Sequence, residues 1–278
     1  MDDRLKREAA FFNDPKGAYL LHFLDKGSSR FARWLIREVL KSWDKHLGLL
    51  DPAWVKDKVV LEACCGNPRV LRYFIMMGAR KVIGCDIAKE FLAAGLVTSR
   101  TFVYDKEIVC GAPQFSMIIG DVQNLPLAAR SVDTVCCFQA LHHVDMDRFA
   151  SECARVLVPG GHVFISDPVG SHPLRGFGDW VGRRLGPMTG DEKSYDPAEV
   201  VRVFEQEGFR VVNLVSLNPF SEIYFQVTEL LTRLSPSVSF YLKIPMCALN
   251  RVEPFIEKTV LQKYPSLGWR FALALEKG

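Results

Sequence analysis

The sequence lacks the features that would direct the chain into or across a membrane. Its first eight residues contain no apolar segment of the kind that a secretory signal needs. No uninterrupted apolar run is long enough to span a bilayer. There is also no internal repeat and no low-complexity stretch. These absences predict an ordinary globular protein of the cytoplasm.

The chain also has little excess charge. Its net charge of +3 over 278 residues is too small to argue for a nucleic-acid partner by itself. Hydrophobic residues make up 49% of the sequence, which is enough for a large core. The length fits one domain with insertions, or one domain with a cap.

The eight cysteines do not have the spacing of a common zinc site. Cys64 and Cys65 are adjacent, as are Cys136 and Cys137, without the two-residue gap of such sites. Cys85 and the second pair fall in apolar runs, where cysteine behaves as a small hydrophobic residue. The sequence therefore predicts reduced core thiols and no metal site.

Three apolar runs each end in an acid. They lead into Glu62, Asp86 and Asp121. Each run is typical of a short buried strand that delivers a carboxylate at its C-terminal end. The interval from Glu62 to Asp86 leaves room for one crossover helix. This pattern predicts an open, doubly wound α/β sheet with a nucleoside-type ligand in its crevice, and Asp86 as the acceptor of two ribose hydroxyls.

These residues resemble the class I S-adenosylmethionine-dependent methyltransferases, particularly the branch that includes ubiquinone- and menaquinone-biosynthesis enzymes. Three later landmarks occur in the family's order, over residues 120–127, 131–144 and 155–165. The resemblance covers residues 57–168 well and the rest loosely. It implies a Rossmann-like seven-stranded sheet with an antiparallel last strand. It also implies S-adenosylmethionine as the cofactor, S-adenosylhomocysteine as the product and a small-molecule methyl acceptor.

The glycine-rich loop departs from the family's pattern of acid-x-Gly-x-Gly-x-Gly. The three glycine positions are here Cys64, Gly66 and Pro68. Gly66 keeps the backbone freedom that lets the loop approach a ligand. Pro68 lacks a backbone N–H but suits the first turn of a helix. We expect a loop that binds S-adenosylmethionine with an altered fit around the methionine portion.

The resemblance also implies a role for each residue at the cofactor. Glu62 orients the loop or meets the methionine amino group, and Asp86 takes the ribose. Asp121 accepts from the adenine amino group, and the backbone of Val122 donates to the ring. Gln139 lies beneath the methyl site; for Gln139 and Glu62 a cap or loop hydrogen bond is an equal alternative. The predicted cofactor-binding residues are Glu62, Cys64, Gly66, Asp86, Ile87, Asp121, Val122 and Gln139.

Three histidines are candidates for catalytic proton transfer, because histidine titrates near neutral pH. They are His142, His143 and His172. A general base is needed only if the acceptor is protonated when it binds. The alternative for the first two is that they shape the exit of a strand, and for His172 that it is a plain loop residue.

The chain divides into four predicted segments. Residues 1–50 form a helical N-terminal extension, and residues 51–217 form the cofactor-binding core, in which residues 169–190 are a link rich in glycine and arginine. Residues 218–268 form a helical cap rich in large apolar side chains, and residues 269–278 form the last core strand. In the extension, a helix over about residues 30–47 carries a basic ridge, which is either a solvated face or a contact with an anionic membrane.

The most favoured function is methyl transfer to a small, largely apolar acceptor such as a quinone, a lipid-linked molecule or a polyketide-like molecule. Binding of a nucleic acid would require a basic groove with aromatic residues, so we expect no nucleic-acid partner. One alternative is a protein of this fold that binds the cofactor but catalyses a reaction other than methylation. The other is a non-catalytic binding or membrane-docking protein. The oligomeric state is left open.

Overall fold

The computed structural model describes residues 45–66, 70–89, 114–185, 192–232 and 241–278, with residues 3, 6, 34, 35 and 41 in addition. Most of the predicted N-terminal extension, including most of its basic helix, lies outside these ranges. Pro68 of the glycine-rich loop lies outside them as well.

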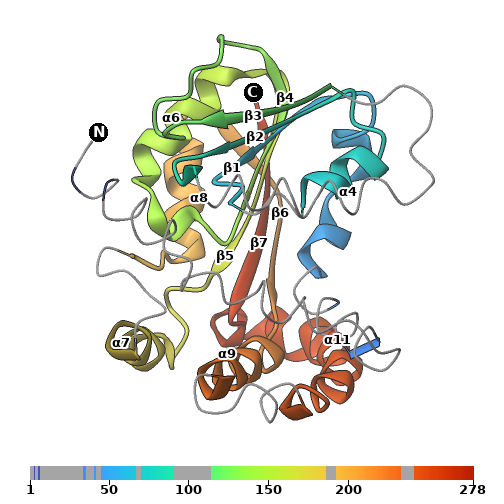
Figure 1. The fold of residues 1–278 in the computed structure, drawn as a ribbon, viewed down its shortest axis with the longest axis vertical. Helices are drawn as coiled ribbons and strands as arrows, with labels where there is room; N and C mark the ends of the chain where they lie inside the picture. Colours follow the sequence, from blue (N-terminus) through green and yellow to red (C-terminus); the bar gives the residue numbers. More distant parts are fainter. Residues whose placement is uncertain are drawn as a thin grey trace.

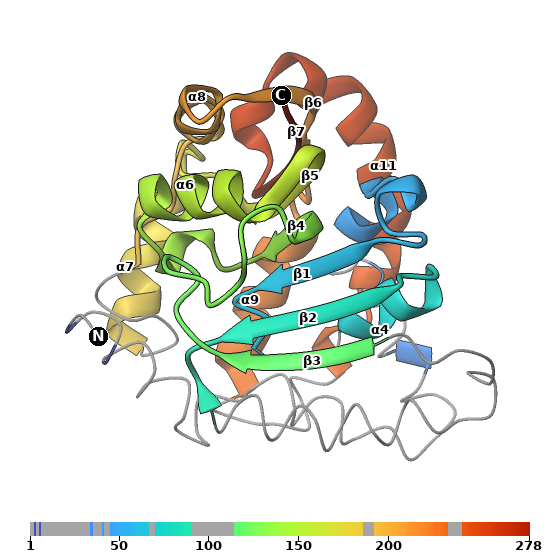
Figure 2. The same ribbon diagram turned by 90° about the horizontal axis from the view of Figure 1, so that it is seen from above.

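The centre of the molecule is one seven-stranded sheet with the order β3-β2-β1-β4-β5-β7-β6 (Figures 1 and 2). Strands β1 to β5 are parallel to one another, whereas β7 runs antiparallel to both β5 and β6. The predicted fold class, a doubly wound Rossmann-like sheet with an antiparallel last strand, is therefore confirmed. The strands are β1 (Val59–Ala63), β2 (Lys81–Asp86), β3 (Gln114–Ile119), β4 (Val132–Phe138), β5 (Leu157–Pro168), β6 (Phe209–Leu217) and β7 (Arg270–Lys277).

Helices cover both faces of this sheet (Figure 2). On one face, α6 (Met146–Val156) and α8 (Pro197–Gln206) pack over alternate residues of β1, β4, β5 and β7. On the other face, α4 (Leu71–Met76) joins a second cluster that includes Val60, Cys136 and Phe164. Because neighbouring strand residues point to opposite faces, the continuous apolar runs in the sequence supply both clusters.

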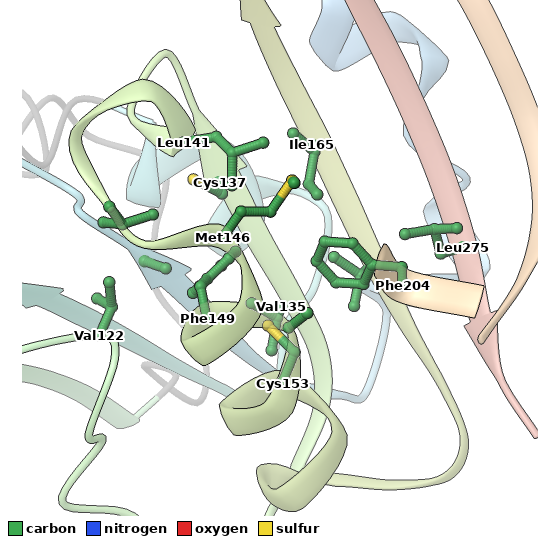
Figure 3. Packing of buried hydrophobic residues seen from close by; sticks show 14 of the residues in the cluster. Val122, Val135, Cys137, Leu141, Met146, Phe149, Cys153, Ile165, Phe204 and Leu275 are labelled. Atoms are coloured by element: carbon green, nitrogen blue, oxygen red, sulfur yellow. The ribbon is translucent and has the colours of Figure 1, made fainter. Parts of the chain in front are cut away.

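Helix α6 shows how the pattern of apolar residues determines this packing. Its buried residues recur at helical spacing along one face: Met146, Phe149, Ala150, Cys153 and Val156. Figure 3 shows this face directed into the cluster that also contains Phe204 and Leu275. The side chain of Asp145 begins the helix by accepting a hydrogen bond from the backbone of Arg148 at 3.1 Å.

Residues 169–190, which the sequence analysis treats as a connecting link, contain helix α7 (Arg175–Leu185). Its three glycines weaken the helical pattern in the sequence. One of them has a packing role, because a Cβ at Gly178 would lie 3.1 Å from the Trp269 ring. The Arg175 guanidinium lies over the same ring at 3.9 Å, which fixes the start of the helix against β7.

Two further helices, α9 (Ser221–Thr232) and α11 (Met246–Lys263), lie between β6 and β7. They gather with α7 at one end of the molecule (Figure 1). The buried carboxylate of Glu253 in α11 accepts hydrogen bonds from the backbone N–H groups of Phe220 and Ser221 and from the Ser221 hydroxyl. A side chain of one helix thus satisfies the N-terminal donors of the other. This contact fixes where α9 begins.

Four short 3-10 helices complete the described structure: η2 (Lys45–Leu49), η3 (Pro52–Trp54), η4 (Leu141–His143) and η5 (Pro265–Leu267). Within the described ranges, no helix has the length and apolar character required to cross a membrane. The cysteines in those ranges are free thiols, and most are buried in the core.

Candidate functional site

The ends of the parallel strands meet along one edge of the sheet. Ala63 of β1 pairs with Cys85 of β2 and with Cys137 of β4, and Asp86 pairs with Ile119 of β3. Glu62, Asp86, Asp121 and Gln139 are therefore brought to this edge from four separate parts of the sequence. Glu62 is buried, with 3% of its surface exposed.

The glycine-rich loop after β1 takes a left-handed backbone conformation at two positions. The φ angle is 53° at Cys64 and 44° at Gly66. Glycine adopts this conformation freely, whereas another residue costs about 1–2 kcal/mol. The structure thus shows why a glycine would suit position 64. Cys64 occupies it, with its side chain packed against the core cluster.

Asp86 is held by two backbone donors. Its Oδ2 accepts from the N–H of Gly66 at 2.7 Å, and its Oδ1 accepts from the N–H of Ala88 at 2.8 Å. Burial raises the pKa of this carboxyl, and these hydrogen bonds oppose the rise by favouring the charged form. Each carboxylate oxygen has a further lone pair, so the group can still accept from ribose hydroxyls. Ile87 lies half-buried in the same turn.

The side chain of Asp121 accepts hydrogen bonds from within its own loop. Its Oδ1 accepts from the backbone N–H of Gln123 at 2.8 Å and from the side-chain amide of Gln123 at 3.0 Å. This oxygen of Asp121 thus already accepts two hydrogen bonds within the loop. The Val122 side chain is buried in the core, which fixes the backbone between them (Figure 3).

Helix α6 holds the rest of this segment through two side chains that the sequence analysis did not assign to the site. The Arg155 guanidinium donates to the carbonyls of Leu127 at 2.7 Å and Leu125 at 2.9 Å. The Glu152 carboxylate accepts from the backbone N–H of Leu125 at 2.7 Å. The hydrogen bond from Arg155 lowers the pKa of Glu152. Nothing in the sequence except their i, i+3 spacing marks these two residues as a pair.

His142 is paired with a buried carboxylate. Its Nδ1 lies 3.0 Å from Oδ1 and 3.1 Å from Oδ2 of Asp167 at the end of β5, and Asp167 is fully buried. A carboxylate at Nδ1 selects the tautomer with its proton there and leaves a lone pair on Nε2. Asp167 ends an apolar strand, as Asp86 does, and the same sequence pattern marks it.

His143 lies beside His142, with ring centroids 4.1 Å apart, and its Nδ1 is 4.0 Å from Oε1 of the buried Glu192. Tyr195 holds this region in place by donating its hydroxyl to the carbonyl of Val144 at 2.9 Å. Ligand atoms of His142, His143 and Glu192 lie within 4.8 Å of one another. This spacing is looser than bonds of about 2.1 Å to one ion would produce. We therefore interpret the group as two imidazole–carboxylate pairs.

His172 lies apart from this pair, in the loop before α7. Its Nδ1 accepts from the backbone N–H of Leu174 at 3.1 Å, so the neutral ring carries its proton on Nε2. Burial, together with the charge of Arg175, lowers the pKa of His172. This arrangement suits a hydrogen-bond donor better than the predicted proton acceptor.

Gln139, the last of the predicted cofactor residues, begins the loop that carries both histidines. Its φ angle is 51°, and its backbone N–H donates to the carbonyl of Ser166 at 2.7 Å. Its side chain lies against Arg270, a residue to which the sequence analysis gave no role. The sequence offers no signal for this contact, because the two residues lie far apart in the chain.

Comparisons with known proteins agree with this geometry. Residues 61–165 match the family described as "Methyltransferase domain". A ubiquinone biosynthesis O-methyltransferase from Cupriavidus pinatubonensis is 34% identical over 196 residues, which cover 64% of this chain and 72% of that protein. A "Probable S-adenosylmethionine-dependent methyltransferase" from Mycolicibacterium smegmatis is 36% identical over 110 residues, and this match spans 39% of the present chain and 37% of that protein.

Among solved structures, the geranyl diphosphate C-methyltransferase of Streptomyces coelicolor superposes with a TM-score of 0.65. The superposition covers 100% of this chain and 99% of that one, at 15% sequence identity. At this identity the likeness concerns the fold alone. Three observations together identify the family. They are the sequence match to the O-methyltransferase, the acidic residues at successive strand ends and the seven-stranded sheet. The chain belongs to the class I S-adenosylmethionine-dependent methyltransferases.

Proposed function

We propose that the protein transfers the methyl group of S-adenosylmethionine to a hydroxyl oxygen of a small, largely apolar acceptor. The quinone, lipid-linked and polyketide-like classes all fit this description. The observation that carries the proposal is the pairing of His142 with the buried Asp167 beside the strand ends. A hydroxyl must lose its proton to become a good nucleophile, and this pair is built to accept one.

The residues at the sheet edge fit the cofactor. When bound, S-adenosylmethionine supplies an electrophilic methyl group on a sulfonium. The chain offers three carboxylates at successive strand ends for its polar groups. Asp86, held by Gly66 and Ala88, would bind the ribose hydroxyls. Glu62 would serve the amino group, and Asp121 with the backbone of Val122 would serve the adenine.

The orientation of His142 determines where the hydroxyl proton of the acceptor goes. Because Asp167 keeps the imidazole proton on Nδ1, the lone pair of Nε2 is free to take the hydroxyl proton of the acceptor. The resulting imidazolium is stabilised by the buried carboxylate 3.0 Å away. The chain's other contribution is to hold the oxygen in line with the methyl group and exclude water.

An apolar pocket of about 640 Å³ supports an apolar acceptor. It lies between the loop that carries His172 and helices α9 and α11, and its walls are almost entirely hydrocarbon. The loop leaves β5 only a few residues after Asp167. We propose that the pocket holds the apolar part of the acceptor, with His172 as a donor to an oxygen on it. Its wall includes Pro219, Phe220, Ile223, Val227, Leu249 and Ile256.

The exposed side chains of helix α7 favour a protein that contacts a membrane surface from the cytoplasm. Phe177 and Trp180 are 67% and 59% exposed and stack on one another, and Arg183 and Arg184 follow in the last turn. Exposed aromatic side chains beside basic ones suit an interface with anionic lipids. Leu174, just before the helix, is exposed and also lines the pocket. An apolar acceptor dissolved in lipid would thus meet the pocket at the membrane surface.

The test uses a hydroxylated quinone with a prenyl tail as the probe and measures formation of S-adenosylhomocysteine. We expect His142→Gln and Asp167→Asn to lower kcat by about 10²–10⁴-fold, the usual contribution of a general base. Cofactor affinity, measured by calorimetry, should stay within a few-fold. His162→Gln is the matched control, because His162 stacks on Trp54 at 4.1 Å in a part of β5 remote from Asp167. Full turnover in His142→Gln would refute the base.

A further inference from the structure

We infer that Arg270 is a positioning residue that sets the loop from Gln139 to His143 and ties it to the cap helix α9. The inference rests on the proposed function, since that loop carries the proposed base. Arg270 is the first residue of β7 and lies opposite Pro168 of β5 and Leu217 of β6. Only 1% of its surface is exposed, so it is a buried cation at the end of the sheet where β5 and β6 finish.

The guanidinium of Arg270 contacts three separate segments. With the Gln139 amide oxygen facing it, that oxygen accepts from Nη1 at 3.1 Å and from Nη2 at 2.5 Å. Nη2 also donates to Oε2 of Glu222 in α9 at 2.6 Å. Nη1 donates to Nδ1 of His46 in η2 at 3.1 Å. The Arg270 guanidinium therefore joins the loop from Gln139 to His143, helix α9 and the short helix η2.

Gln139 is a residue whose backbone needs such support. Its φ of 51° lies in the left-handed region, which costs a residue with a Cβ about 1–2 kcal/mol. Strained residues of this kind persist where their surroundings over-determine them. Here the N–H of Gln139 is fixed on Ser166, and its side chain is fixed on Arg270. The turn at Gln139 directs the chain out of β4 towards His142.

A simple buried ion pair would not explain this arrangement. Neutralising Arg270 requires only Glu222, and a lysine could make that pair. The further bonds to Gln139 and His46 use the planar fork that distinguishes arginine from lysine. The cap end of the network is itself anchored, since the N-terminus of α9 is fixed by Glu253 and Glu253 pairs with Lys45 at 3.1 Å. A shift of α9 would therefore also move the loop that carries the proposed base.

Loss of the Arg270–Gln139 contact should therefore lower the rate of methyl transfer more than it lowers the affinity for the cofactor. The test uses two substitutions, Arg270→Lys and Gln139→Leu, each of which removes the contact from one side. Gln139→Glu retains an acceptor oxygen for Arg270 and serves as the rescue variant. Arg210→Ala is the control, because Arg210 pairs with Glu276 at the exposed edge of the same sheet.

We expect Arg270→Lys and Gln139→Leu each to lower kcat by at least tenfold, with the Kd for S-adenosylmethionine within about threefold. The double variant should be no worse than the worse single variant, as for two partners in one interaction. Hydrogen exchange of the peptide over residues 139–144 should speed up in both, and Gln139→Glu should restore protection and most of kcat. The control should match the wild type in every readout.

Three results would overturn the inference. One is unchanged kcat and unchanged exchange in Gln139→Leu, a variant that also decides the matter if Arg270→Lys does not fold. The second is a large loss of cofactor affinity without faster exchange, which would make Gln139 a cofactor ligand instead. The third is independent, multiplicative effects of the two substitutions. Failure of the proposed base would appear separately, as full turnover in His142→Gln while residues 139–144 still loosen in Gln139→Leu.

Discussion

Gly66 and Asp86 are joined by a hydrogen bond from the Gly66 backbone N–H to Oδ2 of Asp86, at 2.7 Å. The bond links the glycine-rich loop after β1 to the acid that ends β2. The proposed ribose ligand, Asp86, and the loop proposed to contact the methionine portion are therefore held to one another by this bond. A change in the carboxylate should disturb both at once.

Asp86→Ala should weaken the binding of S-adenosylmethionine by about 2–3 kcal/mol, because hydrogen bonds to a charged group are the stronger kind. Isothermal titration calorimetry measures the effect directly. Asp147→Ala removes an exposed acid from the first turn of α6 and is the matched control. Equal affinity in wild type and Asp86→Ala would show that the ribose is held elsewhere.

The pair of Glu152 and Arg155 predicts a pH dependence of stability. Folding lowers the pKa of Glu152 from its ordinary value of 4.5, through the hydrogen bond from Arg155 and then that from Leu125. The stabilisation is therefore complete above the unfolded pKa and is lost as the pH falls through the folded pKa. Glu152→Gln should cost about 1 kcal/mol of unfolding free energy at pH 7, and this cost should shrink as the pH falls and the Glu152 carboxylate of the wild type becomes protonated.

Urea unfolding of wild type and Glu152→Gln between pH 3 and pH 7 provides the measurement. Glu205→Gln, an exposed acid of α8, is the control. If the difference between wild type and Glu152→Gln stayed constant over this range, the ionised carboxylate would not be the source of the stabilisation.

The buried thiols should be chemically inert in the folded protein. Burial raises the pKa of Cys85 to about 12, and it raises the pKa of Cys64 and Cys137 well above the usual range. The thiolate is the reactive form, so Cys85 should alkylate at least about 10²-fold more slowly than in the unfolded chain. Iodoacetamide labelling at pH 7.5, read by peptide mass spectrometry with and without urea, tests this. Rapid labelling of Cys85 without urea would indicate an opened sheet edge.

Filling the apolar pocket should alter substrate selectivity without disabling the chemistry. Ile223→Trp places a large ring in the wall formed by α9. We expect kcat/KM for a prenylated hydroxyquinone to fall by about tenfold or more, and that for the untailed ring to change little. Val212→Trp, on an exposed position of β6, is the control. An equal loss for both substrates would place the tail outside this pocket.

The sequence by itself determined the sheet and its edge. Apolar runs that end in Glu62, Asp86 and Asp121 predict parallel strands, because a buried strand must be apolar on both faces and its end is where polar groups can meet a ligand. The start of a helix is likewise a local feature of the chain. Asp145 and Asp196 begin α6 and α8 by accepting backbone hydrogen bonds within three residues, which the sequence alone can specify.

Only the tertiary structure decided which side chains act on one another across the chain. His142 meets Asp167, and Arg270 meets Gln139 and Glu222, through contacts that join residues on different strands and helices. Helix α7 likewise depends on tertiary contacts, since its three glycines weaken the helical pattern and packing against Trp269 stabilises it. Periodicity and spacing record what each segment prefers locally. Pairing over long distances depends on strand register and crossover geometry, which bring together residues that the sequence keeps apart.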